Sequence, residues 1–70
     1  MRQSDDPRIR VSVIRGDHGY GWEYQVFDED GETILDESDS GGYTYETQAL
    51  AFDEGHRFAR EAQARFAPKG

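Results

Sequence analysis

The sequence contains no cysteine among its 70 residues, which excludes a disulfide framework and the zinc sites that are built on thiolates. A chain this short buries only roughly 60% of the surface that its unfolded form exposes, so its core is thin. Small domains without disulfides usually gain stability from a metal or from a partner subunit. The lack of cysteine also fits a reducing compartment, and we expect the protein in the cytoplasm.

The sequence also has no basic segment followed by an apolar one and no apolar run long enough to cross a bilayer, so we expect no membrane partner. Lys and Arg are absent between Arg15 and Arg57, although that stretch holds twelve carboxylates. The formal net charge is -7, and residues 1–40 hold eleven acids and four arginines. A surface of this sign repels phosphate, which argues against nucleic acid as a partner. Acidity can equally serve to keep a small domain in solution.

Two segments alternate polar and apolar residues with the period of a strand that buries one face. The residues predicted to point inward are Ile9, Val11, Val13, Trp22, Tyr24 and Val26. A glycine-rich loop separates these two segments, and a tight turn leads from the second into a shorter apolar segment. We therefore expect strands near residues 8–15, 21–28 and 32–37.

After a break rich in serine and glycine, Thr44 is the predicted N-cap of a helix near residues 45–66, with Glu46 in its first turn. One face of this helix must cover the sheet, and it consists of Phe58, Ala51, Ala62, Gly55, Phe66, Ala59 and Phe52. Since a glycine inside a helix costs about 1 kcal/mol relative to alanine, Gly55 predicts a close approach to Trp22 or Tyr24. The outer face carries a ladder of alternating charge, Asp53, Arg57, Glu61 and Arg65.

The predicted fold class is therefore α+β, a three-stranded antiparallel meander packed against one C-terminal helix in the order β-β-β-α. We divide the chain into a disordered tail, residues 1–7, and a single domain, residues 8–70.

No motif points to catalysis or to a metal. The glycines of residues 16–21 precede a strand, whereas a dinucleotide loop needs a helix N-terminus. Four residues from Asp28 to Glu37 match part of the spacing of a calcium loop, but Val26 stands where the first carboxylate ligand belongs. His18 and His56 have no second histidine or cysteine at ligand spacing. We predict no catalytic residue, no metal and no cofactor, and the protein is not expected to be an enzyme.

Three short motifs, at residues 21–26, 30–35 and 40–44, together with Ala49 and Leu50, resemble the small bacterial YegP-like domain. The resemblance covers about residues 21–60. That family often has a tandem pair of copies, and tandem copies can cover each other's sheets. A lone copy therefore implies self-association or another partner, and the resemblance brings no catalytic residue.

The sequence predicts a non-enzymatic bacterial protein-interaction module that forms a homodimer or binds a basic protein. The alternative is an acidic inhibitor that imitates nucleic acid and occupies a basic protein groove. A small-ligand or metal binder is the third class.

Self-association is predicted on the sheet face opposite the helix, where Ile14 and Phe27 join whichever of Ile34 and Leu35 points outward. A basic partner is predicted to meet the acids of the tight turn and the third strand. The predicted interaction residues are Ile14, Phe27, Leu35, Asp28, Asp30, Asp36 and Asp39.

Overall fold

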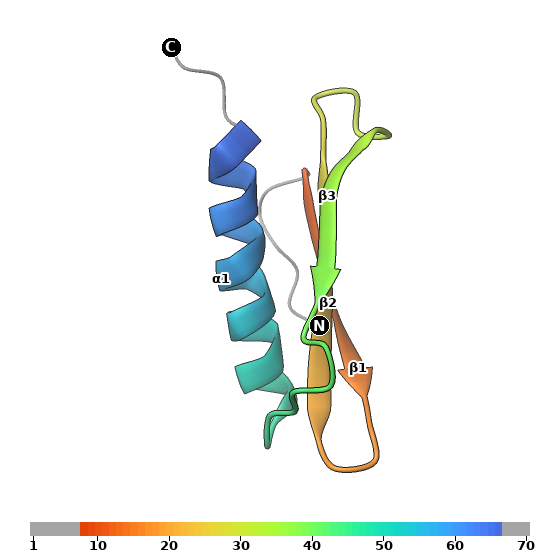
Figure 1. Ribbon diagram of the computed structural model, residues 1–70, viewed down its shortest axis with the longest axis vertical. Helices are drawn as coiled ribbons and strands as arrows, with labels where there is room; N and C mark the ends of the chain where they lie inside the picture. The colour runs from red at the N-terminus through yellow and green to blue at the C-terminus, as the bar shows by residue number, and fades with distance from the viewer. Residues whose placement is uncertain (1–7, 67–70) are drawn as a thin grey trace.

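The computed structural model describes residues 8–66, which form three strands and one helix (Figure 1). The elements are β1 (Ile9–Arg15), β2 (Tyr20–Phe27), β3 (Ile34–Asp39) and α1 (Gln48–Phe66). Both strand pairs are antiparallel in the order β1-β2-β3, and α1 lies along one face of the sheet. The predicted β-β-β-α fold is confirmed. The tail predicted at residues 1–7 and the last four residues of the predicted domain lie outside the described residues.

The strand register places the predicted inward residues on the face that α1 covers. Their cross-strand pairs are Ile9 with Val26, Val11 with Tyr24 and Val13 with Trp22. Residues directly opposite one another share a face, so all six point to the helix. Ile9 of β1 and Trp22, Tyr24 and Val26 of β2 are buried, whereas Val11 and Val13 of β1 are only half-buried.

The helix contacts the sheet through its smallest residues, Ala51, Gly55, Ala59 and Ala62. A Cβ built on Gly55 would lie 2.8 Å from Trp22 Cβ and 3.0 Å from Val11 Cγ1, so the predicted close approach is to Trp22. The aromatic residues of the predicted face lie at its margins. Phe58 is 36% exposed and stacks on Trp22 at 5.2 Å between ring centroids, and Phe66 is 46% exposed.

The helix begins later than predicted, because Thr47 rather than Thr44 is its N-cap. Leu50 N donates to Thr47 Oγ1 at 3.1 Å, and Ala51 N donates to Thr47 O at 3.2 Å. The predicted cap is therefore wrong by three residues, and Glu46 precedes the helix.

A bridge between Tyr20 and Tyr45 explains this late start. Tyr20 N donates to Tyr45 O at 2.9 Å, and Tyr45 N donates to Tyr20 O at 2.8 Å. This pairing holds the chain extended at Tyr45. A Cβ on Gly19 would lie 2.6 Å from Tyr45 O, so the hairpin loop needs glycine at that position.

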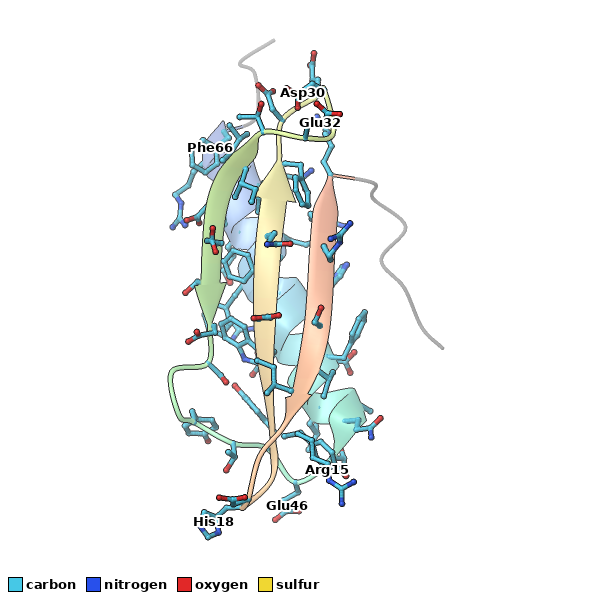
Figure 2. All side chains as sticks on the ribbon, turned by 90° about the vertical axis from the view of Figure 1, so that its right-hand side faces the viewer. Arg15, His18, Asp30, Glu32, Glu46 and Phe66 are labelled. Atoms are coloured by element: carbon cyan, nitrogen blue, oxygen red, sulfur yellow. The ribbon has the colours of Figure 1, made fainter. Side chains whose placement is uncertain are left out.

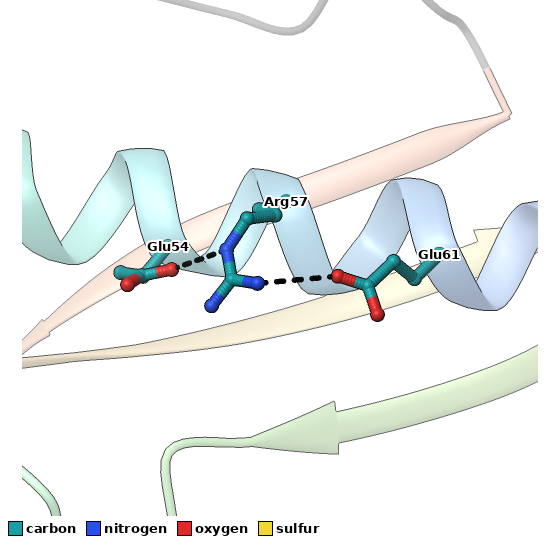
Figure 3. A network of polar contacts seen from close by, with 3 residues as sticks. All are labelled: Glu54, Arg57 and Glu61. Atoms are coloured by element: carbon teal, nitrogen blue, oxygen red, sulfur yellow. Dashed lines mark hydrogen bonds and ion pairs between the residues drawn. The ribbon is translucent and has the colours of Figure 1, made fainter.

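On the outer face of α1, Arg57 lies between two carboxylates (Figure 3). Its Nε is 2.7 Å from Glu54 Oε2, and its Nη1 is 3.3 Å from Glu61 Oε2. The predicted pairing of Arg57 with Glu61 is confirmed. The predicted continuation of the ladder through Arg65 is wrong, because Arg65 reaches across to Asp36 of β3 at 3.3 Å.

Candidate functional site

The face of the sheet that α1 leaves uncovered is turned toward the viewer in Figure 2, and we call it the open face. The register assigns it the residues Arg10, Ser12, Ile14, Gly21, Glu23, Gln25, Phe27, Ile34, Glu37 and Asp39. They alternate along the strands with the residues that point to the helix.

The apolar residues of the open face lie at its two ends. Ile14 is opposite Gly21 at one end, and Phe27 is opposite Ile34 at the other. Ile14 is 43% exposed and Ile34 is 44% exposed. Phe27 is six residues beyond Gly21 along β2, which is about 20 Å at the rise of a strand. The prediction of one joined apolar patch is therefore corrected to two apolar ends.

A β-bulge in β3 decides which of its aliphatic residues belongs to this face. Val26 is opposite Asp36, but the next residue, Phe27, is opposite Ile34, so Leu35 is the extra residue of the bulge. Leu35 packs against the buried core. The apolar residue that β3 contributes to the open face is therefore Ile34, and the predicted interaction residue Leu35 is corrected.

The same bulge turns Asp36 toward the helix. Tyr24 Oη donates to Asp36 Oδ2 at 3.1 Å, and Arg65 Nη2 lies 3.3 Å from the same oxygen. Burial, and then the bond to Asp36, raise the pKa of Tyr24 above its ordinary value. Asp36 therefore joins β3 to the end of α1 and is not part of an outward acidic surface, which corrects the prediction.

The predicted acids of the tight turn hold the turn together. Asp30 Oδ1 accepts hydrogen bonds from Glu32 N at 2.8 Å and from Thr33 N at 2.9 Å, and Asp30 Oδ2 accepts one from Thr33 Oγ1 at 2.6 Å. The Thr33 hydroxyl and these backbone donors lower the pKa of Asp30. Asp28 Oδ1 accepts from Glu29 N at 2.7 Å. Both carboxylates are exposed at the end of the sheet where Figure 2 labels Asp30 and Glu32.

Glu23, Glu37 and Asp39 form what we call the acidic centre of the open face. Glu23 of β2 is directly opposite Asp39 of β3, and Glu37 lies on the same face opposite Gln25. Like charges directly opposite one another destabilise a sheet. Of the acids predicted to interact, only Asp39 belongs to this cluster. Glu37 was not among them, because the bulge reverses the alternation of β3. Glu23 was not among them either, although the alternation of β2 places it on this face.

A hollow of about 270 Å³ lies beside the last turns of α1. Its charged lining comes from Arg8, Asp28, Glu29 and Arg60, and Val26 and Leu35 are among its apolar residues. This volume is below the range of about 300–1,000 Å³ that is usual for small-molecule sites.

Within residues 8–66, no group of three or more His, Cys, Asp or Glu side chains is placed to hold a metal ion. The described part of the chain also has no helix of the length and apolar character needed to span a membrane.

The chain matches no family model, no curated protein and no solved structure. The resemblance to the YegP-like domain therefore stays a prediction.

Proposed function

We propose that this protein is a non-enzymatic interaction module that binds a basic segment of a partner protein on the open face. The supporting observation is the composition of that face, an acidic centre between two apolar ends. The carboxylates of Glu23 and Asp39 are directly opposite one another, which costs the sheet stability, and Asp39 Oδ1 also accepts a hydrogen bond from Gly41 N at 2.8 Å. A cationic side chain bound between the two carboxylates would offset their repulsion.

The distance between the two apolar ends of the open face indicates what kind of partner segment would fit there. Ile14 at one end and Phe27 with Ile34 at the other are about 20 Å apart, the length of roughly six residues of extended chain. A fitting segment carries Lys or Arg in its middle and an apolar residue near each end. The apolar contacts supply affinity, and the charges supply orientation and a faster encounter.

An acidic inhibitor that imitates nucleic acid is a narrower form of the same proposal, in which the basic segment lines a nucleic-acid groove. Competition separates the two, since DNA or RNA displaces such an inhibitor but leaves an ordinary partner bound. A cytoplasmic location in a bacterium and a relationship to YegP-like domains are further parts of this proposal, supported by the cysteine-free sequence and by the motifs at residues 21–44.

The test is affinity capture from a bacterial lysate, in which three forms of this protein serve in turn as the bait. They are the wild type, a face variant (Glu23→Gln, Glu37→Gln, Asp39→Asn) and a control variant (Asp17→Asn, Glu32→Gln, Glu46→Gln). Both variants lose three negative charges, but the control residues are exposed and lie off the open face. We expect a basic protein with the wild type and the control variant and its loss with the face variant. Equal capture by all three would refute the proposal.

A further inference from the structure

The outer edge of β1 has no partner strand among the described residues, and two hydrogen bonds show which backbone groups face it. Phe27 N donates to Arg8 O at 2.7 Å, and Gly16 N donates to Gly19 O at 2.8 Å. Along a strand of an antiparallel pair, the backbone N–H and C=O groups of successive residues alternately bond to the neighbouring strand and point away from it. The two bonds therefore show that the even-numbered residues of β1 bond to β2. The N–H and C=O groups at the outer edge are those of Ile9, Val11, Val13 and Arg15.

The two edges of this sheet are not equally protected against pairing. β3 carries a bulge and the three acids Asp36, Glu37 and Asp39, which are devices that discourage a further strand. β1 has no proline, no bulge and no acid. Its Val11 and Val13 point to the helix side but are only half-buried, although Ile9 of the same strand is buried. β1 is thus the edge that can accept a strand.

We propose that two copies of this chain pair through their β1 strands, antiparallel, about a two-fold axis at Ser12. This register uses all seven residues of β1, and every outward N–H and C=O group meets a partner. The opposed pairs are Ser12 with Ser12, Val11 with Val13, Arg10 with Ile14 and Ile9 with Arg15 of the second copy. The result is one six-stranded sheet with both helices on the same side.

Side chains fit this register on both faces. On the helix side, Val11 and Val13 of one copy cover Val13 and Val11 of the other, which completes their burial. On the open face, Arg10 is directly opposite Ile14 of the second copy, while its guanidinium lies over Phe27 of its own chain, 5.5 Å from the ring centroid. No arginine is directly opposite another arginine, so the pairing opposes no like charges.

The charge distribution selects β1 over β3. Residues 8–15 hold three arginines and no acid in a chain of net charge -7. Pairing through β1 leaves the acidic β3 strands at the two outer edges, five strand spacings or about 24 Å apart. Pairing through β3 would bring the acids of both copies together. The occupant of the β1 edge is therefore a second copy of this chain.

A single thiol tests the register, because the chain has no cysteine of its own. In Ser12→Cys, the two thiols belong to a non-hydrogen-bonded pair with Cα atoms about 4.5 Å apart, within the range of a disulfide. In the control Arg10→Cys, the two positions are about 13 Å apart along the strand. Mild oxidation should give roughly tenfold more covalent dimer for Ser12→Cys than for Arg10→Cys. Equal yields from the two variants would overturn the register.

Amide hydrogen exchange of the wild type distinguishes edge pairing from stacking of two open faces, which could also bring Ser12 residues together. Edge pairing slows exchange at Val11 and Val13 as the protein concentration rises, whereas Ser12, whose N–H faces β2, is slow throughout. Exchange at Val11 and Val13 that does not depend on concentration would overturn the proposal.

Val13→Pro supplies an independent test, since it removes one outward N–H and leaves the bonds to β2 in place. By light scattering, the wild type should reach twice the monomer mass of 8.0 kDa. Val13→Pro, with its fold verified by circular dichroism, should stay at the monomer mass. A wild type that stays monomeric at high micromolar concentration would also overturn the proposal. This pairing does not use the acidic centre, so its failure leaves the proposed function intact.

Discussion

Gly55 of α1 packs directly against Trp22 of β2, so closely that a Cβ on Gly55 would lie 2.8 Å from Trp22 Cβ. We predict that Gly55→Ala destabilises the protein, because overpacking costs about 1–3 kcal/mol and alanine recovers only about 1 kcal/mol of helix propensity. Urea unfolding can be followed by the fluorescence of Trp22, the single tryptophan. Ala64→Gly, at an exposed position of the same helix, measures the propensity contribution alone. A more stable Gly55→Ala protein would contradict the close packing.

The N-cap at Thr47 predicts different effects for two threonines near the start of α1. Thr47→Ala removes the acceptor of the Leu50 N–H and should lower the free energy of unfolding by about 1 kcal/mol. Thr44 precedes the helix at an exposed position, so Thr44→Ala should change the free energy of unfolding by less than about 0.5 kcal/mol. The same urea titration measures both, and a larger loss from Thr44→Ala would restore Thr44 as the cap.

The raised pKa of Tyr24 predicts a loss of stability at alkaline pH. The folded state favours the neutral phenol, so this contribution is fully present below the unfolded pKa of about 10 and is lost as pH rises through the higher folded pKa. Tyr24→Phe has no phenol to ionise, so its free energy of unfolding should fall less steeply above about pH 10. Parallel pH curves for the two proteins would show that Tyr24 titrates as in the unfolded chain.

The hydrogen bonds of Asp30 predict a shift that nuclear magnetic resonance can measure. Thr33 contributes the largest part of the depressed pKa of Asp30 through its hydroxyl. Thr33→Val removes that donor but keeps the backbone N–H, so the pKa of Asp30 should rise toward its ordinary value. Thr44→Val, elsewhere on the surface, should leave it unchanged. An Asp30 pKa that is the same in Thr33→Val and in the wild type would contradict this account of the turn.

The alternation of β1 and β2 was sufficient to predict which residues face the helix, because neither strand is interrupted. The glycine at position 55 likewise indicated a close approach to Trp22 or Tyr24, and the structure shows that the contact is with Trp22. Two features depend on contacts between distant residues and were missed. The bridge between Tyr20 and Tyr45 moves the start of the helix past Thr44.

The bulge at Leu35 is the second such feature, and it matters more for the candidate site. It reverses the alternation of β3, so that Leu35 and Asp36 turn to the helix while Ile34, Glu37 and Asp39 face outward. Nothing local in the sequence marks this bulge. The alternation of β2 therefore places Glu23 on the open face from the sequence alone, but the acids that β3 contributes to that face could be chosen only from the register.

The central claim is that the acidic centre of the open face binds a basic partner. The most direct test is isothermal titration of the captured partner with the wild type, the face variant and the control variant at low and high salt. We predict that the face variant binds at least about tenfold more weakly and loses most of the salt dependence, because charge pairs at the interface are gone. The control variant should bind within about twofold of the wild type. Equal affinities and equal salt dependence for all three proteins would contradict the claim and would leave the acidity a role in solubility alone.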